Sequence, residues 1–375
     1  MAAAEPVALS TTDALALRMQ SLLLRPGSAE YPSSVGDVVT WMGAMQSQDL
    51  ASGLWSFGAR LPGATVSDVE AALERPEALR TWPMRGTVHF VPPRDAHWML
   101  AVLGERPLAQ AAKRREYIGL PEREADRAVD VLGKTLAGGG RLTRAECTAA
   151  LEQAGIDGAG QLTYHMLWYA SQRGVTCIAP NVGNEQTFVL LDEWVPDPVK
   201  LDRDEALATM ALRYFQSHGP TTRKNFAGWM GSTAADAKLG IAGCGDVLAT
   251  VRVDGTEMIV VADALDAPAA EPLADDEFVA LPGFDEYLLG FKERLMVLDA
   301  EHLELVVPGK NGVFRATIVR GGRVISTWKR TLSKQKMTVE VWPFGKLRVK
   351  DKRAIEASLE PYAQFLGRTL EVRWP

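Results

Sequence analysis

The chain has 375 residues, enough for about two to four domains, because a single hydrophobic core usually stops growing at roughly 250 residues. Apolar residues make up 47% and charged residues 23% of the chain, a balance that excludes a largely disordered or fibrous protein. No uncharged apolar run reaches the ~18 residues of a membrane helix, and the start lacks the basic-then-apolar order of a secretory signal. We therefore expect a cytoplasmic protein with no membrane partner.

The cysteines and histidines predict neither a disulfide framework nor a metal site. Cys147, Cys177 and Cys244 lie far apart and are odd in number, and the five histidines show no metal-ligand spacing. The glycine run at 138–140 does not belong to a Gly-x-x-x-x-Gly-Lys-Ser/Thr phosphate loop. We expect structural thiols, no metal and no cofactor.

The net charge of −6 hides a strong asymmetry along the chain. The segment 305–353 holds thirteen Lys or Arg against two acids, a net charge of +11, so the remaining chain carries −17. A segregated basic face is typical of proteins that bind a polyphosphate, because each neutralised phosphate releases condensed counterions. The simpler alternative is a solvated basic surface.

In chain order, residues 13 to about 266 predict repeated helical units that each end in β-type segments. The first unit has a helix over 13–24, a second helix that starts at Ser33-Ser34, and a strand over 87–91. In the second and third units, Thr143 and Thr222 follow a turn and are able to cap a helix. In the second unit, the preceding helix is expected at 124–136 and the later strands at 175–178 and 187–191. In the third unit, the helix is expected at 204–217 and the strands at 247–253 and 257–261.

Helix, turn, helix and a two-stranded ribbon is the winged-helix order. From residue 291 onward the pattern changes to period-two segments separated by glycine turns, which predict antiparallel strands with a Gly321-Gly322 hairpin. These strands are expected at 313–320, 323–330 and 336–343, followed by a helix over 352–366 and a strand over 369–374. The predicted fold is α+β and mainly α, with winged-helix units at 1–125, 126–200 and 201–280 and a basic, barrel-like antiparallel β domain at 281–375.

Four motifs occur in an order that resembles the winged-helix DNA glycosylases of the AlkZ and YcaQ type, over nearly the whole length. They are GAMQSQD at 43–49, MRGTVHF at 84–90, LPGFDEYLLG at 281–290 and STWKR at 326–330. In that family a Gln-x-Gln or Gln-x-Asp pair carries catalysis, usually around an aliphatic residue. Gln46 and Gln48 match this pair, and Ser47 departs from the usual middle residue.

The resemblance implies a DNA glycosylase that hydrolyses the N-glycosidic bond of alkylated purines, typically N7-alkylguanine, with some members opening interstrand crosslinks. Alkylation leaves the purine cationic, so it departs without a strong acid while water attacks an oxocarbenium-like sugar. A Gln carbonyl oxygen accepts a hydrogen bond from that water, and its dipole faces the developing positive charge. No lysine is clearly placed for Schiff-base chemistry, so a monofunctional enzyme without strand cleavage is expected.

Gln46 and Gln48 are separated by one residue, so on an extended segment they project to the same side and are expected to hold one water together. Asp49 is the competing candidate because it is the only carboxylate of the motif. We rank it below the glutamines, since its side chain is expected to point away from that of Gln48. The simpler alternative for all three residues is a polar helix terminus.

Further candidates lie outside this motif. His89 is expected to line the site and to bind a phosphate or the damaged base, with a structural role on its strand as the alternative, and Arg85 is expected to bind a phosphate. Asp285 and Glu286 either contact the site or pair with Arg294 as a brace. DNA contacts are expected from the start of the third unit's recognition helix and from the basic domain, namely from Thr222, Arg223, Lys224, Arg315, Arg320, Arg323, Trp328, Lys329 and Arg330.

Two features of the basic domain suit nucleic acid. The Gly321-Gly322 turn between Arg320 and Arg323 forms a cationic tip of the kind that enters a DNA groove. Trp328, Lys329 and Arg330 combine an aromatic ring with two cations, which suits tracking of a DNA backbone. An ordinary exposed turn is the alternative for the tip.

The predicted partner is double-stranded DNA that carries alkylated bases, bound by a monomer, because three DNA-binding modules in one chain need no second copy to span a duplex. A non-catalytic winged-helix transcriptional regulator is one alternative, and it would prefer one DNA sequence. A toxin-sequestering self-resistance protein is another, and it would bind a genotoxin in the absence of DNA.

Overall fold

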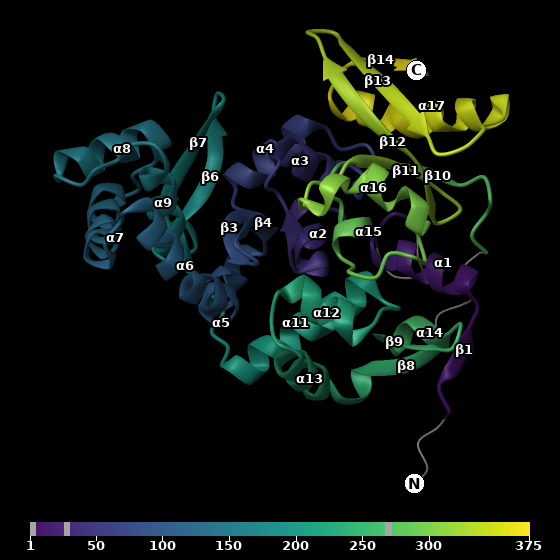
Figure 1. The fold of residues 1–375 in the computed structure, drawn as a ribbon, viewed down its shortest axis with the longest axis horizontal. Helices are drawn as coiled ribbons and strands as arrows, with labels where there is room; N and C mark the ends of the chain where they lie inside the picture. Colours follow the sequence, from purple (N-terminus) through teal and green to yellow (C-terminus); the bar gives the residue numbers. More distant parts are fainter. Residues whose placement is uncertain (1–4, 26–30, 267–271) are drawn as a thin grey trace. The chain divides into compact units, whose positions relative to one another are not determined.

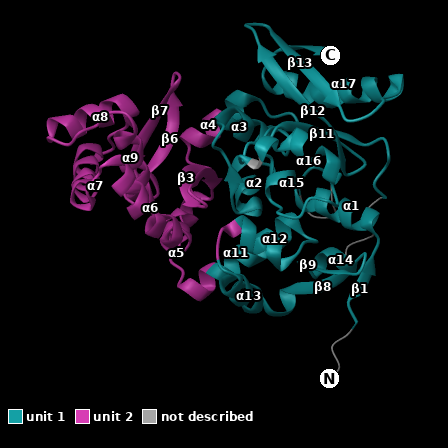
Figure 2. Cartoon of the chain, in the orientation of Figure 1, with its two compact units in different colours: residues 1–69, 207–229, 233–375 teal, residues 70–206, 230–232 magenta. Residues whose placement is uncertain are grey.

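The computed structural model describes residues 5–25, 31–266 and 272–375 (Figure 1). The chain divides into two compact units (Figure 2): unit 1 comprises 1–69, 207–229 and 233–375, and unit 2 comprises 70–206 and 230–232. Each unit is therefore assembled from segments that are distant in sequence. Among the described residues, no helix is long and apolar enough to cross a membrane.

Unit 2 combines a sheet with a set of helices. Its strands are β3 (Leu79–Met84), β4 (Thr87–Val91), β5 (Leu142–Thr143), β6 (Thr176–Val182) and β7 (Glu185–Leu190), hydrogen-bonded in the order β4-β3-β6-β7-β5 with antiparallel neighbours. Its helices are α5 (Ala96–Leu103), α6 (Glu105–Ile118), α7 (Glu122–Leu136), α8 (Arg144–Gln153), α9 (Gln161–Gln172) and α10 (Leu191–Trp194), and α4 (Val66–Glu74) leads into the unit. The strand expected at 87–91 is confirmed, as are the paired strands near 175 and 187.

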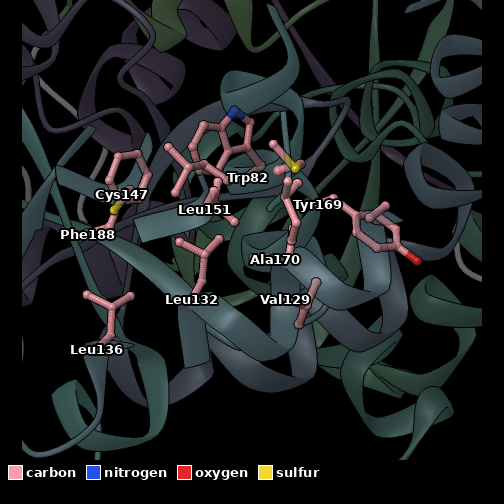
Figure 3. Packing of buried hydrophobic residues seen from close by; sticks show 14 of the residues in the cluster. Trp82, Val129, Leu132, Leu136, Cys147, Leu151, Tyr169, Ala170 and Phe188 are labelled. Atoms are coloured by element: carbon pink, nitrogen blue, oxygen red, sulfur yellow. The ribbon is translucent and has the colours of Figure 1, made fainter. Parts of the chain in front are cut away.

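The core of unit 2 forms where α7, α8 and α9 pack on the β6-β7 hairpin (Figure 3). Leu132, Leu151 and Phe188 are almost completely buried there. Thr143 caps α8 as predicted, because its side chain accepts from the Glu146 N–H and the Glu146 carboxylate accepts from the Thr143 N–H. The helix therefore begins where the sequence pattern indicates.

The cysteines of unit 2 are structural, as expected. Cys147 belongs to this core and Cys177 lies on β6, and both are free and buried. Burial raises the pKa of Cys147 to about 12 and raises the pKa of Cys177 as well. Both thiols therefore stay protonated and unreactive at neutral pH.

The N-terminal and middle segments of unit 1 contain helices and a small sheet. The helices are α1 (Thr11–Ser21), α2 (Val35–Met42), α3 (Leu50–Gly58), α11 (Arg203–His218), α12 (Arg223–Met230), α13 (Ala234–Gly243) and α14 (Asp263–Asp266), and the short strand β2 (Met45–Gln46) lies between α2 and α3. β8 (Leu248–Val253) and β9 (Thr256–Val261) form the predicted hairpin. β1 (Val7–Leu9) pairs with β8 in parallel, a long-range pairing that local patterns do not predict.

The C-terminal part of unit 1 is a sheet with the order β10-β11-β12-β13-β14, which forms a half-barrel. Its strands are β10 (Phe278–Leu281), β11 (Ala316–Arg320), β12 (Arg323–Leu332), β13 (Lys336–Pro343) and β14 (Thr369–Arg373), and its helices are α15 (Glu286–Leu289), α16 (Leu303–Val306) and α17 (Val349–Phe365). The predicted antiparallel arrangement is wrong for the last strand, because α17 carries the chain back along the sheet and β14 pairs with β13 in parallel.

Helix α3 packs on α17 through aromatic rings. The Trp55 ring stacks on that of Tyr362 with 4.6 Å between centroids and lies 5.3 Å from that of Phe365. Gly58 sits beneath the same rings, where a Cβ would come 2.6 Å from Trp55 and 2.7 Å from Phe365. The helix that follows the glutamine motif is therefore fixed against the C-terminal domain within unit 1.

The close approach of two aromatic rings to Gly58 predicts that a single added methyl group lowers the stability of the protein. Gly58→Ala should destabilise the protein by about 1–3 kcal/mol, because rigid aromatic rings leave no room for it. Gly133→Ala in α7 is the matched control, since its nearest neighbour atom lies at 3.6 Å and alanine favours a helix by up to about 1 kcal/mol. Urea unfolding of both variants measures the difference, and equal stabilities would contradict the packing described here.

Candidate active site

The two glutamines of the motif occupy different environments in unit 1. Gln46 ends β2 and is 9% exposed, whereas Gln48 lies in a bend before α3 and is exposed. Ser47 between them is completely buried. The extended segment on which both side chains were expected to share one side thus ends before Gln48, because the chain turns there to start a helix.

The Gln46 segment is held through its backbone. The Gln46 N–H donates to Oε1 of Glu286 at 3.2 Å, a contact between residues 240 apart in sequence. The side-chain oxygen of Gln46 is buried and accepts no hydrogen bond from the described residues. A buried acceptor without a donor costs about 1–3 kcal/mol, and such groups recur where a water or substrate supplies the missing donor.

Glu286 connects this segment to α11 and α12. Its other carboxylate oxygen accepts from the Trp229 indole N–H at 2.9 Å and lies 3.3 Å from Nε2 of His218. Burial lowers the pKa of His218 more than the hydrogen bond to Glu286 raises it, so the imidazole is neutral at pH 7. These contacts satisfy a carboxylate that is itself fully buried.

Asp285 forms a buried ion pair with Arg60 rather than a brace with Arg294. The two guanidinium nitrogens of Arg60 lie 2.8 and 3.0 Å from the two carboxylate oxygens, and Ser56 donates to the same carboxylate at 3.1 Å. Burial acts to lower the pKa of Arg60, but the charge of Asp285, its hydrogen bond and the nearby Glu286 together outweigh burial, and the pKa is raised. Arg294 instead donates from Nε to the Leu288 carbonyl.

Asp49 is the N-cap of α3. Its Oδ2 accepts from the Ser52 N–H at 3.3 Å and from the Ser52 hydroxyl at 2.5 Å. An N-cap carboxylate stabilises a helix both by this hydrogen bond and by its charge near the positive end of the helix. A structural role therefore explains why an acid follows the glutamine pair.

Arg85 and His89 belong to unit 2 and contact each other. His89 is completely buried on β4, with Nδ1 placed 2.8 Å from the Thr87 carbonyl. Nδ1 therefore carries the proton, and Nε2 accepts from the Arg85 guanidinium at 2.9 Å. The expectation that His89 contacts phosphate or a base is wrong for this ring, because its two nitrogens are engaged inside the unit and it orients Arg85 instead.

The predicted recognition-helix residues lie at the start of α12. Thr222 caps the helix, since its hydroxyl accepts from the Asn225 N–H at 3.2 Å. Lys224 pairs with Glu293 at 2.8 Å, and this hydrogen bond lowers the pKa of Glu293. Arg223 is exposed and makes no ion pair within the described residues, so of the two cations it is the more available to a phosphate.

The Gly321-Gly322 turn does not form the expected DNA-entering tip. Gly322 is buried, and a Cβ there would come 2.8 Å from Leu273 and 3.1 Å from Leu15. Its carbonyl accepts from the Tyr287 hydroxyl. The turn thus packs on the interior of unit 1, and the prediction is wrong because local turn chemistry does not reveal what covers a turn.

Trp328 is likewise not available to DNA. It is 3% exposed, donates from its indole N–H to the Thr317 carbonyl at 3.1 Å and packs near Tyr362. The next residue, Lys329, is exposed because neighbouring side chains on a strand point to opposite faces. Arg330 lies with its guanidinium 5.3 Å from the centre of the Tyr362 ring.

The remaining predicted DNA-binding arginines all hydrogen-bond to backbone carbonyls in unit 1. Arg323 also pairs with Asp299 at 2.5 Å, so its charge is largely neutralised. The carbonyl contacts are Arg315 to Leu305 at 3.2 Å, Arg320 to Asp275 at 2.7 Å and Arg323 to Met296 at 2.9 Å. These residues support loops of the domain; Arg320 lies 4.0 Å from the Asp351 carboxylate, so of the three Arg315 is the one that keeps its charge at the surface.

The exposed basic tip lies instead at the β12-β13 hairpin. Lys334 sits in the turn between these strands, and the preceding Leu332 is 47% exposed. The sequence signal for it is the polar run at 333–336, which separates two period-two segments and contains two lysines. The glycine pair at 321–322 is the stronger turn signal, which is why the reasoning from sequence favours the wrong hairpin.

Residues 39–365 match a family model described as DNA glycosylase AlkZ-like. The chain belongs to this family, and it is therefore a DNA glycosylase, an enzyme that hydrolyses N-glycosyl bonds. It is 27% identical over 348 residues to an interstrand DNA cross-link repair glycosylase from Streptomyces sahachiroi, which covers 88% of this chain and 89% of that protein. The solved structure of the Streptomyces sahachiroi DNA glycosylase AlkZ matches it with a TM-score of 0.80 and 26% identity, over 98% of this chain and 100% of the other.

The buried ion pair predicts a large effect on stability. Arg60→Met should destabilise the protein by roughly 3–5 kcal/mol, because it leaves the Asp285 carboxylate buried without a partner. Arg75→Met removes the exposed pair with Glu77 and should change stability by less than about 1 kcal/mol. Urea unfolding checks both values. Recovery of stability in Arg60→Met/Asp285→Leu would support the assignment, and a small loss in Arg60→Met alone would refute it.

Proposed function

We propose that this DNA glycosylase releases alkylated purines, N7-alkylguanine among them, from double-stranded DNA, and that Gln46 and Gln48 are its catalytic residues. The observation that carries the proposal is the Gln46 carboxamide, whose backbone is anchored by Glu286 while its carbonyl oxygen has no donor among the described residues. The name of the Streptomyces sahachiroi relative supports interstrand crosslinks as a further substrate.

The chemistry requires little acid catalysis. The electron pair of the bond between the sugar carbon and the purine nitrogen passes to the cationic base, which leaves as a neutral molecule. A water molecule attacks the sugar carbon and loses its proton to solvent. The Gln46 carbonyl is suited to accept from that water and to face the positive charge that develops on the sugar.

Gln48 and Asp49 divide the remaining tasks in this proposal. The exposed Gln48 carboxamide has both donors and an acceptor, so it can contact a phosphate or sugar oxygen and the water. Asp49 orients α3 through Ser52 and does not need to accept a proton. The exposed cations Arg223, Lys329 and Lys334 hold the duplex through its phosphates.

We infer that the segments 1–125, 126–200 and 201–280 are winged-helix units, that 281–375 is the basic domain, and that a monomer binds the DNA. The hairpins β3-β4, β6-β7 and β8-β9 each follow a set of helices in chain order, which supports this division. Analytical ultracentrifugation with and without a duplex tests the oligomeric state.

The catalytic assignment predicts the effect of removing both amides. Gln46→Ala/Gln48→Ala should slow release of free N7-methylguanine from methylated duplex DNA by on the order of 10²- to 10⁴-fold. Affinity for an undamaged duplex should fall far less than the rate of base release, because neither residue supplies a charge. Gln364→Ala, which removes an exposed amide from α17, is the matched control. Wild-type release by the double variant would refute the assignment.

The role given to Asp49 predicts tolerance of a neutral cap. Asp49→Asn keeps an N-cap side chain and removes the charge, so the rate of base release should fall by less than the roughly tenfold change that 1.4 kcal/mol represents. Single-turnover kinetics on the same methylated duplex measures this rate. A loss as large as that of the double glutamine variant would instead identify Asp49 as a catalytic carboxylate.

A further inference from the structure

Unit 2 contains a pocket of about 760 Å³ that is lined by its own residues alone. This volume is within the range of roughly 300–1,000 Å³ that small-molecule sites occupy. Helices α6 and α9 supply most of the lining at helical spacing, through Arg106, Gln110 and Arg114 and through Gln161, Tyr164, His165 and Trp168. Gln46, Gln48 and Asp49 are not among the lining residues.

The pocket is cationic. Four arginines line it, namely Arg85, Arg106, Arg114 and Arg144, and its lining contains no carboxylate. Within the described residues, the last three form no ion pair and donate only to neutral oxygens, those of Gly231, Gln161 and Gln186 respectively. Other arginines of unit 2 pair with acids, as in Arg94–Asp197, Arg141–Glu74, Arg173–Asp126 and Arg203–Glu105. Arg106, Arg114 and Arg144 therefore keep their full charge for a ligand.

Aromatic rings form a second part of the lining. Tyr164 is 42% exposed and Trp168 is half-buried, so both offer ring surface to the pocket. The Arg144 guanidinium lies 5.6 Å from the centre of the Tyr164 ring. A flat, electron-rich ring with a cation beside it is a platform on which a nucleobase stacks.

His165 supplies a hydrogen-bonding group without a partner. It is 7% exposed, and its Nε2 is buried with no hydrogen bond to any described residue. Burial, with the charges of Arg115 and Arg114, lowers its pKa to about 4, so the ring is neutral at pH 7. The neighbouring Gly160 begins α9 without a side-chain cap, which leaves the positive end of this helix open to an anion.

We propose that this pocket binds a nucleotide, with its phosphate on Arg114 and Arg144, its base against Tyr164 and Trp168, and a base edge hydrogen-bonded to His165. The ligand is either a free nucleotide or an unstacked nucleotide of a DNA strand, which share this chemistry. The inference does not rest on the catalytic roles of Gln46 and Gln48.

Calorimetric titration of the full-length protein tests the phosphate site. Deoxyguanosine 5′-monophosphate should bind at least tenfold more tightly than deoxyguanosine, and Arg114→Gln/Arg144→Gln should weaken its binding at least tenfold. Both side chains are exposed, so the variant should fold, and circular dichroism checks this. Arg123→Gln/Lys134→Gln, which removes two exposed cations of α7 outside the pocket, is the control of equal charge. The proposal is overturned if the double variant binds like the wild type.

A second comparison tests the base and identifies the source of the nucleotide. Tyr164→Ala/Trp168→Leu should weaken binding of the mononucleotide and leave that of inorganic phosphate unchanged; equal loss for both ligands would contradict stacking. A short 5′-phosphorylated single strand is then compared with the mononucleotide. The pocket's ligand is part of a DNA strand if the single strand binds much more tightly and loses this advantage in Arg114→Gln/Arg144→Gln. Equal affinities of the single strand and the mononucleotide identify the ligand as a free nucleotide. Base release by the same arginine variant, beside that of Gln46→Ala/Gln48→Ala, separates this site from the catalytic one.

Discussion

The buried carboxylate of Glu286 is the contact on which the candidate active site depends. It accepts hydrogen bonds from the Gln46 backbone and the Trp229 indole and lies beside His218. A buried charge is stable only when its hydrogen bonds are satisfied, so α11, α12 and α15 must be assembled for β2 to take its position. The Gln46 carboxamide is thus placed by its backbone, and its side-chain oxygen remains available.

The elements around this carboxylate are themselves rigid. Arg60 and Asp285 form a bidentate, fully buried pair, whose net contribution to stability is small but whose loss is severe, because either charge alone is costly in the interior. The stack of Trp55 on Tyr362 ties α3 to α17. In the mechanism that we propose, the Gln46 carboxamide can hold a water only if it does not move during the reaction, and these buried polar contacts and aromatic rings restrict its segment.

Charge along the chain indicates the class of partner and is a weaker guide to individual residues. Arg323 lies in the most basic segment, yet Asp299 neutralises it, and Arg315 and Arg320 hold loops through backbone carbonyls. Arg114 and Arg144 lie far from that segment in sequence and have only neutral partners in the described structure. Whether a cation is available to a ligand therefore depends on the acids that folding places beside it.

Local patterns by themselves determined most helices and strands and the Thr143 and Thr222 caps, because periodicity and capping act over a few residues. Only the tertiary structure decided that Trp328 and the Gly321-Gly322 turn are covered, that β14 runs parallel to β13, and that Glu286 reaches Gln46. Each of these depends on contacts between segments distant in the chain, and a repeat of 2 or 3.6 residues carries no information about which distant segment covers a given face.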